Sequence, residues 1–201
     1  MCHGIVDEAK CCETLQHPKF YEFLWFIDQD LAAQAQATDC PCGGKLHSAR
    51  YPRKPRGAPR ELLGPEYARR LSFCCEKDGC RRRTTPPSVR FLGRRVYLGA
   101  VVVLASAMTG AVTLSGAAVL QVLLGVSLRT LKRWRVWWRT TFLATTFWPL
   151  ARSRFDRPVA ISALPGSLLE RFAGVDLAAK LGALLRFLLP LTTNAHGLRA
   201  F

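Results

Sequence analysis

The sequence predicts a mainly α-helical protein with one small β unit, organised as several short modules. Three observations support this prediction. Apolar residues recur at three- and four-residue steps over long stretches, which is the period of an amphipathic helix. Cysteines gather in a region rich in glycine and proline, which favours turns over long helices. Charge is distributed unevenly along the 201 residues, which indicates segments with different roles.

Changes in composition set the module boundaries. We predict an N-terminal helical segment, a cysteine-containing β unit, a basic linker, a three-helix unit and a C-terminal helical segment, over residues 1–39, 40–83, 84–95, 96–148 and 149–201. In the first segment, apolar residues between Phe20 and Leu31 fall on one face of a helix expected across about 18–37. In the last segment, a leucine-rich helical pattern extends over 163–191.

The net charge is +15, and most of it lies in the middle of the chain. Residues 1–39 contain seven acidic and two basic residues. Residues 40–154 contain twenty-two basic and four acidic residues, and residues 155–201 are nearly balanced. A charge this large predicts a polyanionic partner, either nucleic acid or an anionic membrane surface. The middle of the chain is therefore expected to meet it.

Eight cysteines and no secretory signal pattern at the N-terminus predict a cytosolic protein, where cysteine clusters bind metal more often than they form disulfides. A zinc ribbon presents two thiolates from each of two knuckles to one tetrahedral ion. Cys-Pro-Cys-Gly-Gly and the later Phe-Cys-Cys with Cys80 fit this plan, because glycines allow tight turns at the sulfurs. We predict Zn²⁺ as the cofactor, with the ligands Cys40, Cys42, Cys75 and Cys80.

Two features leave the ligand set open. Adjacent strand residues point to opposite faces, so Cys74 and Cys75 cannot easily both reach the ion, and Cys75 is favoured. The first knuckle is Cys-x-Cys instead of Cys-x-x-Cys, so that His47 could replace one ligand. The alternative to a metal site is a small core of free thiols.

Two basic stretches flank the predicted ribbon. The stretch between the knuckles, residues 50–57, has prolines that stiffen it, and it is expected to project as an arm onto phosphates or into a minor groove. Three arginines follow the last cysteine. The DNA-contacting residues expected here are Arg50, Arg53, Lys54, Arg56, Arg81, Arg82 and Arg83. A solvated loop is the alternative for the arm.

Residues 115–139 have the pattern of a helix-turn-helix, preceded by a support helix over 97–108. Ser115 is expected to cap a first helix that carries Ala118, Val119, Val122 and Leu123 on one face. Gly125 lies where the turn needs a positive φ, and Ser127 can cap a second helix.

The second helix of this pattern is basic outside and apolar inside. Leu128, Leu131, Trp134 and Trp138 are expected to face the core, and Arg129, Thr130, Lys132, Arg133, Arg135 and Arg139 to face DNA. Arg129 and Arg133 can read guanine bidentately, while Arg135 and Arg139 suit phosphates. A merely solvated charged helix is the alternative.

A membrane span over 96–128 is the less favoured interpretation of the same region. No charged residue occurs there, and thirty-three residues are long enough to cross a bilayer. Glycine, threonine and serine interrupt the run, however, and leave apolar blocks with the length of buried helices.

The stretches CPCGGKLHSARYPRKPRG and RLSFCCEKDGCRRRTTPPSVRFLGRRVY resemble the zinc-ribbon region of bacterial transposase-associated proteins, in which a helix-turn-helix follows the ribbon. The resemblance covers about half of the chain and implies binding to the DNA of a mobile genetic element. The shortened first knuckle departs from the usual pattern. A nuclease core is also missing, because Asp156, Glu170 and Asp176 lie in one short helical stretch instead of flanking strands.

We therefore expect a non-enzymatic, sequence-specific binder of double-stranded DNA in the bacterial cytoplasm, associated with the nucleoid, with no small-molecule substrate. The favoured role is that of an accessory or targeting factor in transposition, and a transcription regulator is the alternative. The C-terminal leucine-rich helices would recruit a transposase or recombinase, or form a homo-oligomer.

Overall fold

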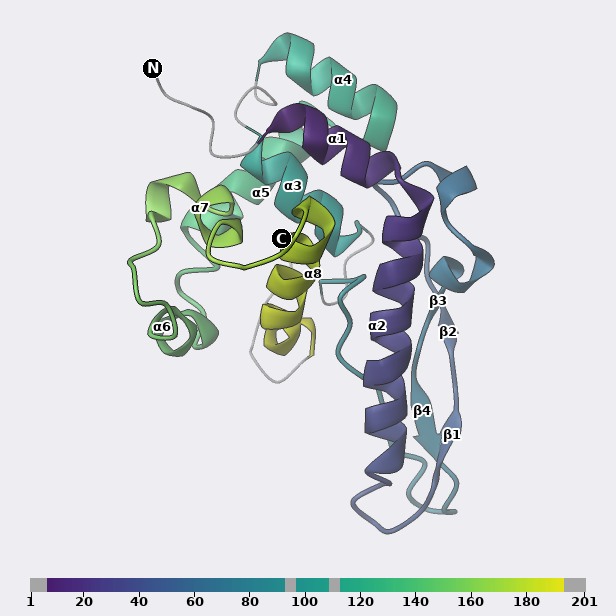
Figure 1. Ribbon diagram of the computed structural model, residues 1–201. Helices are drawn as coiled ribbons and strands as arrows, with labels where there is room; N and C mark the ends of the chain where they lie inside the picture. Colours follow the sequence, from purple (N-terminus) through teal and green to yellow (C-terminus); the bar gives the residue numbers. More distant parts are fainter. Residues whose placement is uncertain (1–6, 93–96, 109–112, 194–201) are drawn as a thin grey trace.

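The computed structural model describes residues 7–92, 97–108 and 113–193, and its elements are mainly helical (Figure 1). The helices are α1 (Glu8–Gln16), α2 (Pro18–Ala37), α3 (Gly99–Ala107), α4 (Leu114–Leu124), α5 (Leu128–Arg139), α6 (Phe147–Arg152), α7 (Gly166–Leu169) and α8 (Leu177–Phe187). The strands are β1 (Leu46–Ser48), β2 (Tyr51–Pro52), β3 (Arg69–Arg70), β4 (Phe73–Cys75) and β5 (Arg83–Thr84). Four 3₁₀ turns are η1 (Arg60–Leu62), η2 (Pro65–Ala68), η4 (Ile161–Ala163) and η5 (Leu189–Thr192). The predicted mainly α class with a small β part is confirmed.

Helix α2 covers the residues predicted for it, and the strands lie alongside it (Figure 1). Strands β1, β4 and β5 form one antiparallel sheet with β4 in the centre, while β2 and β3 form a second antiparallel pair. Leu46 pairs with Cys75, and His47 pairs with Cys74. The sheet is fixed to the last turns of α2, where the Gln36 side-chain amide donates a hydrogen bond to the Leu46 carbonyl at 3.1 Å.

Helices α4 and α5 are joined by a short turn, and their axes are bent by 100°. Gly125 ends α4 with a φ of 62°, and the Ser127 hydroxyl caps α5 by accepting from the Thr130 N–H. Helix α3 packs against α5 as the support helix.

The start and the buried face of α4 differ from the prediction. Thr113 caps α4 in place of Ser115. Ala117, Leu120 and Leu124 face the core, whereas Val119 and Val122, from the apolar face that the sequence indicated, are exposed. An apolar helix without charges has no polar face that would fix its orientation from sequence alone.

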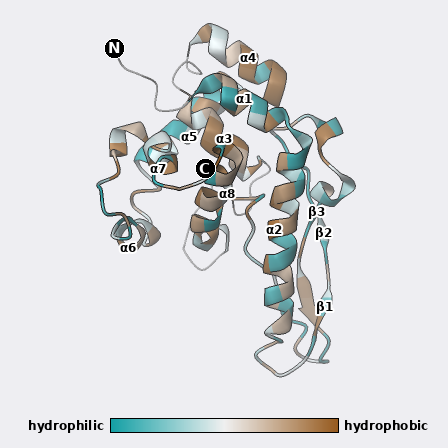
Figure 2. Cartoon of the chain, in the orientation of Figure 1, coloured by the Kyte–Doolittle hydropathy of each residue, from teal (hydrophilic) through white to brown (hydrophobic). Residues whose placement is uncertain are grey.

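One large cluster of buried side chains holds the protein together. It draws members from all five predicted segments, for example Leu24, Tyr67, Phe91, Trp138 and Leu184. Figure 2 shows α3 and α8, in the middle of the helical part, as largely hydrophobic. A second, small cluster joins Ala32 of α2 to the cysteine region. All five predicted segments thus contribute to one core, because each is too short to bury a large core of its own.

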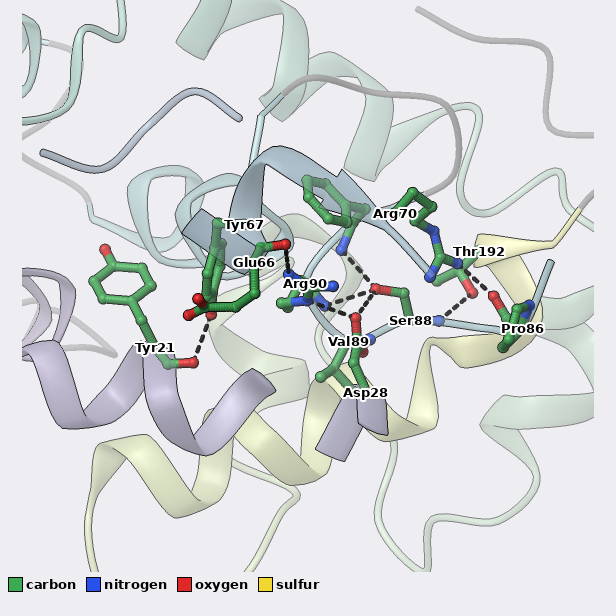
Figure 3. A network of polar contacts seen from close by, with 11 residues as sticks. Tyr21, Asp28, Glu66, Tyr67, Arg70, Pro86, Ser88, Val89, Arg90 and Thr192 are labelled. Carbon is green, nitrogen blue, oxygen red and sulfur yellow. Dashed lines mark hydrogen bonds and ion pairs between the residues drawn. The ribbon is translucent and has the colours of Figure 1, made fainter. Parts of the chain in front are cut away.

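The segment predicted as a basic linker is largely buried as far as residue 92; its residues 93–95 lie outside the described residues. Asp28 and Arg90 form an ion pair in which both side chains are fully buried (Figure 3). The Asp28 carboxylate accepts from the Arg90 Nε at 2.7 Å, from the Ser88 hydroxyl at 2.5 Å and from the Val89 N–H at 2.7 Å. Arg90 is therefore a structural residue, because its charge is neutralised inside the core.

The C-terminal leucine-rich pattern forms the two helices α7 and α8. Helices α7 and α8 are separated by residues 170–176, and the Asp176 side chain caps the start of α8. Within the described residues, no single helix is long and apolar enough to cross a membrane, and the pair α4 and α5 has that length only across its sharp bend.

Candidate metal centre and basic surface

Four thiols meet at the end of α2, and they belong to the four cysteines predicted as ligands. The sulfur atoms of Cys40, Cys42, Cys75 and Cys80 all lie within 4.8 Å of one another. Cys40 Sγ is 3.7 Å from Cys80 Sγ, and Cys42 Sγ is 3.4 Å from Cys75 Sγ. Sulfurs bound tetrahedrally to zinc at 2.3 Å would be about 3.8 Å apart. The cluster therefore fits a metal ion with four thiolate ligands.

The backbone of the first knuckle explains how Cys-x-Cys can supply two ligands. The Gly43 N–H donates to the Cys40 carbonyl at 2.7 Å, and the Cys40 N–H donates to the Gly44 carbonyl at 2.9 Å. Gly43 has a φ of 80°, a conformation that favours glycine. A Cβ at Gly44 would lie 2.7 Å from Cys75 Sγ, so this position has no room for a side chain. The tight turn thus allows the sulfur atoms of Cys40 and Cys42 to belong to the same cluster.

The second knuckle settles the orientation of the adjacent cysteines. Cys75 is buried and its sulfur joins the cluster, whereas Cys74 Sγ lies 3.4 Å from the Arg81 carbonyl. The alternation of side chains along β4 accounts for this difference. The His47 Nε2 atom is 2.8 Å from a Glu76 carboxylate oxygen, and His47 is not among the four grouped residues.

The four thiols differ in acidity. Hydrogen bonds from the Gly44 N–H and from neighbouring thiols lower the pKa of Cys42 to about 6. Burial raises the pKa of Cys75 to about 12. Cysteine binds a metal as the thiolate, so metal binding displaces the thiol protons. A cation in the centre would therefore hold all four cysteines in the deprotonated form.

The basic arm is anchored at both ends and does not project freely. Tyr51 and Pro52 pair with β3, and the Arg53 N–H donates to the Ala68 carbonyl at 2.6 Å. At the other end, the Leu98 N–H donates to the Arg56 carbonyl at 3.0 Å. The N–H and C=O groups of an extended chain can pair with a neighbouring strand. The sequence of the arm alone did not indicate that β3 would be this neighbour.

Aromatic rings connect this arm to the cysteine-containing region and to α5. The guanidinium groups of Arg53 and Arg83 lie over the Tyr51 ring, at 5.4 and 5.8 Å from its centroid. The Tyr97 ring contacts the Trp134 ring of α5 edge-on, with centroids 4.9 Å apart. Arg56 forms a β-bridge with Tyr97. Tyr51 and Tyr97 were not predicted as site residues, although their place within basic sequence is a usable signal.

Ten of the predicted DNA-contacting cations are exposed. They are Arg50, Lys54, Arg56, Arg81, Arg82, Arg83, Arg129, Lys132, Arg133 and Arg139. The four on α5 follow three- and four-residue steps along one face of the helix, opposite the buried Leu131, Trp134 and Trp138. The α5 surface is therefore cationic on its outer side.

The remaining predicted residues, Arg53, Thr130 and Arg135, are partly buried. Arg135 donates a hydrogen bond to the Met108 carbonyl, and burial lowers its pKa. The Thr130 and Ser127 hydroxyls are 3.0 Å apart at the start of α5. These three side chains are directed at the protein itself.

Comparison with known proteins gives no match among family models, curated proteins or solved structures.

Proposed function

We propose that the protein binds double-stranded DNA, without catalysing a reaction, through a surface formed by the ribbon, the arm and α5. The observation that carries this proposal is the continuity of the arm. Its exposed cations Lys54 and Arg56 follow Tyr51, which contacts Arg83 of the ribbon, and Arg56 pairs with Tyr97, which contacts α5. Arg50, also exposed, directly precedes Tyr51. A strip of cations that joins two DNA-binding elements suits a phosphate backbone.

In this proposal the two ends of the surface contact different parts of the DNA. Arg129 and Arg133, exposed in the first half of α5, would read base edges in the major groove. The ribbon arginines Arg81, Arg82 and Arg83 would contact phosphates, which fixes the orientation of the protein without reading sequence.

We also propose that the ion of the metal centre is Zn²⁺, because four thiolates in a closed set are typical of structural zinc sites. Its role would be to hold the two knuckles together, since the small cluster around Ala32 and Leu46 offers few apolar contacts. The resemblance of Cys40–Tyr97 to transposase-associated ribbons supports a role with a mobile genetic element, in which selected DNA sites would match the ends of that element.

Arginine-to-alanine variants at the two ends test the proposal. Arg133→Ala is expected to cost about 1–3 kcal/mol of binding free energy on the selected site and to relax specificity at one base pair. Arg82→Ala is expected to weaken binding on all sequences alike and to reduce the salt dependence by about one ion. The measurement is fluorescence anisotropy across a salt series, on a site selected from random duplexes.

Arg157→Ala provides the matched control, because Arg157 is an exposed arginine outside the ribbon, the arm and α5. It should leave both affinity and specificity unchanged. Wild-type protein that binds no duplex in a salt-sensitive manner, or an Arg157 variant as impaired as the Arg133 variant, would disprove the proposed surface.

A further inference from the structure

The outward face of α4 is uncharged and mostly apolar, although α4 lies at the edge of the molecule (Figure 1). Leu114 is 83% exposed, Val122 is 84% exposed and Val119 is 51% exposed. Leu114, Ala118 and Val122 follow four-residue steps, so they form one stripe with Val119 beside it. The exposed Ser115 and Gln121 are the polar side chains on this face. Single exposed apolar residues are common on proteins, but a continuous stripe indicates a surface that is covered by a partner.

We propose that this face of α4 binds the same face of a second copy of the chain. The argument is one of charge. The chain carries a net charge of +15, so that two copies repel each other wherever their cationic surfaces meet. From Thr113 to Leu128 there is no charged residue. The α4 face is therefore a surface at which two copies meet without repulsion, whereas an anionic partner would be attracted elsewhere.

A two-fold axis across α4 suits this contact. Such an interface uses the same patch on both copies, so it must be complementary to itself, and a neutral apolar stripe meets that condition. Ala118 adds little side-chain bulk to this face, which favours close approach of the two helices.

The size of α4 sets the strength of the expected dimer. Eleven residues make a helix about 16 Å long. A contact of this length falls short of the roughly 800 Å² that each partner buries in a standard interface. We therefore expect weak, reversible association in free solution.

Association on DNA is expected to be stronger, and this part rests on the proposed function. Because α4 and α5 are joined by a short turn and bent by 100°, two paired α4 helices hold two α5 helices at a fixed spacing. Paired recognition helices match two DNA half-sites.

Sedimentation velocity over a concentration series, without DNA, tests the proposal. The full-length wild type should show a reversible monomer–dimer equilibrium, and Val122→Glu should weaken dimerisation at least about tenfold, because a carboxylate would be buried in an apolar contact. Val175→Glu is the matched control, since Val175 is 99% exposed in another part of the chain. It should dimerise like the wild type.

Three results would overturn the proposal. The first is a wild type that stays monomeric at every concentration, and the second is a dimer that Val122→Glu leaves intact. The third is a wild type that binds vesicles without dimerising and loses that binding when Val122 is replaced by Glu. Phosphatidylcholine vesicles serve as the lipid probe. The stoichiometry on a selected duplex should fall from two copies to one in the variant. Since sedimentation needs no DNA, a failure of DNA binding is distinguished from a failure of the dimer.

Discussion

Cys75→Ser is expected to abolish metal binding and to unfold the region around the four thiols. Cys75 is the most deeply buried of the four clustered cysteines, and its sulfur lies 3.4 Å from that of Cys42. Structural zinc contributes on the order of 10–16 kcal/mol of apparent binding free energy in zinc-finger peptides, so a small ribbon depends on it for folding. The measurement is the metal content of the purified protein, together with hydrogen exchange over residues 40–84.

The helical part of the Cys75→Ser variant should remain folded, because its core is a separate and much larger cluster. Circular dichroism should therefore change little, while hydrogen exchange rises in the ribbon. Cys74→Ser is a stringent control, since Cys74 is the adjacent residue but its sulfur faces the Arg81 carbonyl. Loss of the metal in both variants alike would contradict the assigned ligand set.

Asp28→Ala is expected to lower the free energy of unfolding by about 3–5 kcal/mol, because it leaves the Arg90 cation without its partner inside the core. The change also removes the acceptor for the Ser88 hydroxyl and the Val89 N–H. Whole domains are stable by only about 5–15 kcal/mol, so the loss would be a large part of the total. Urea denaturation measures it.

Asp30→Ala is the matched control, because Asp30 is an exposed aspartate on the same helix. Its effect should stay within about 0.5 kcal/mol. The double variant Asp28→Leu with Arg90→Met should recover much of the lost stability, because two apolar side chains need no charge compensation. An Asp28→Ala variant as stable as the control would show that the carboxylate does not stabilise the core.

The features that follow local rules could be predicted from the sequence. The period of apolar residues defines α2, and glycine with serine defines the turn before α5. Alternation along a strand is enough to choose Cys75 over Cys74 as a ligand. Each of these inferences uses residues that are neighbours in the chain.

Features that depend on distant contacts could not be predicted in this way. Asp28 and Arg90 are 62 positions apart, and each looks like an ordinary solvated charge in its own segment. The fixed position of the arm requires β3 and the start of α3, which its own sequence does not specify. The orientation of α4 depends on α5 and the shared core, since the α4 sequence has no charged residue to mark its outer face.

The core that crosses all predicted boundaries has a consequence for dissecting the molecule. A recombinant fragment that starts at residue 96 would carry the helix-turn-helix without Tyr21, Leu24 and Phe91, which pack into the same interior. Every residue of α3 is buried in the intact protein. Cutting the chain at residue 96 would therefore expose part of the apolar surface of α3 to solvent. Domain transplantation is therefore a poor route to isolating either of the two elements proposed to contact DNA, and point substitutions in the intact polypeptide are the appropriate tool.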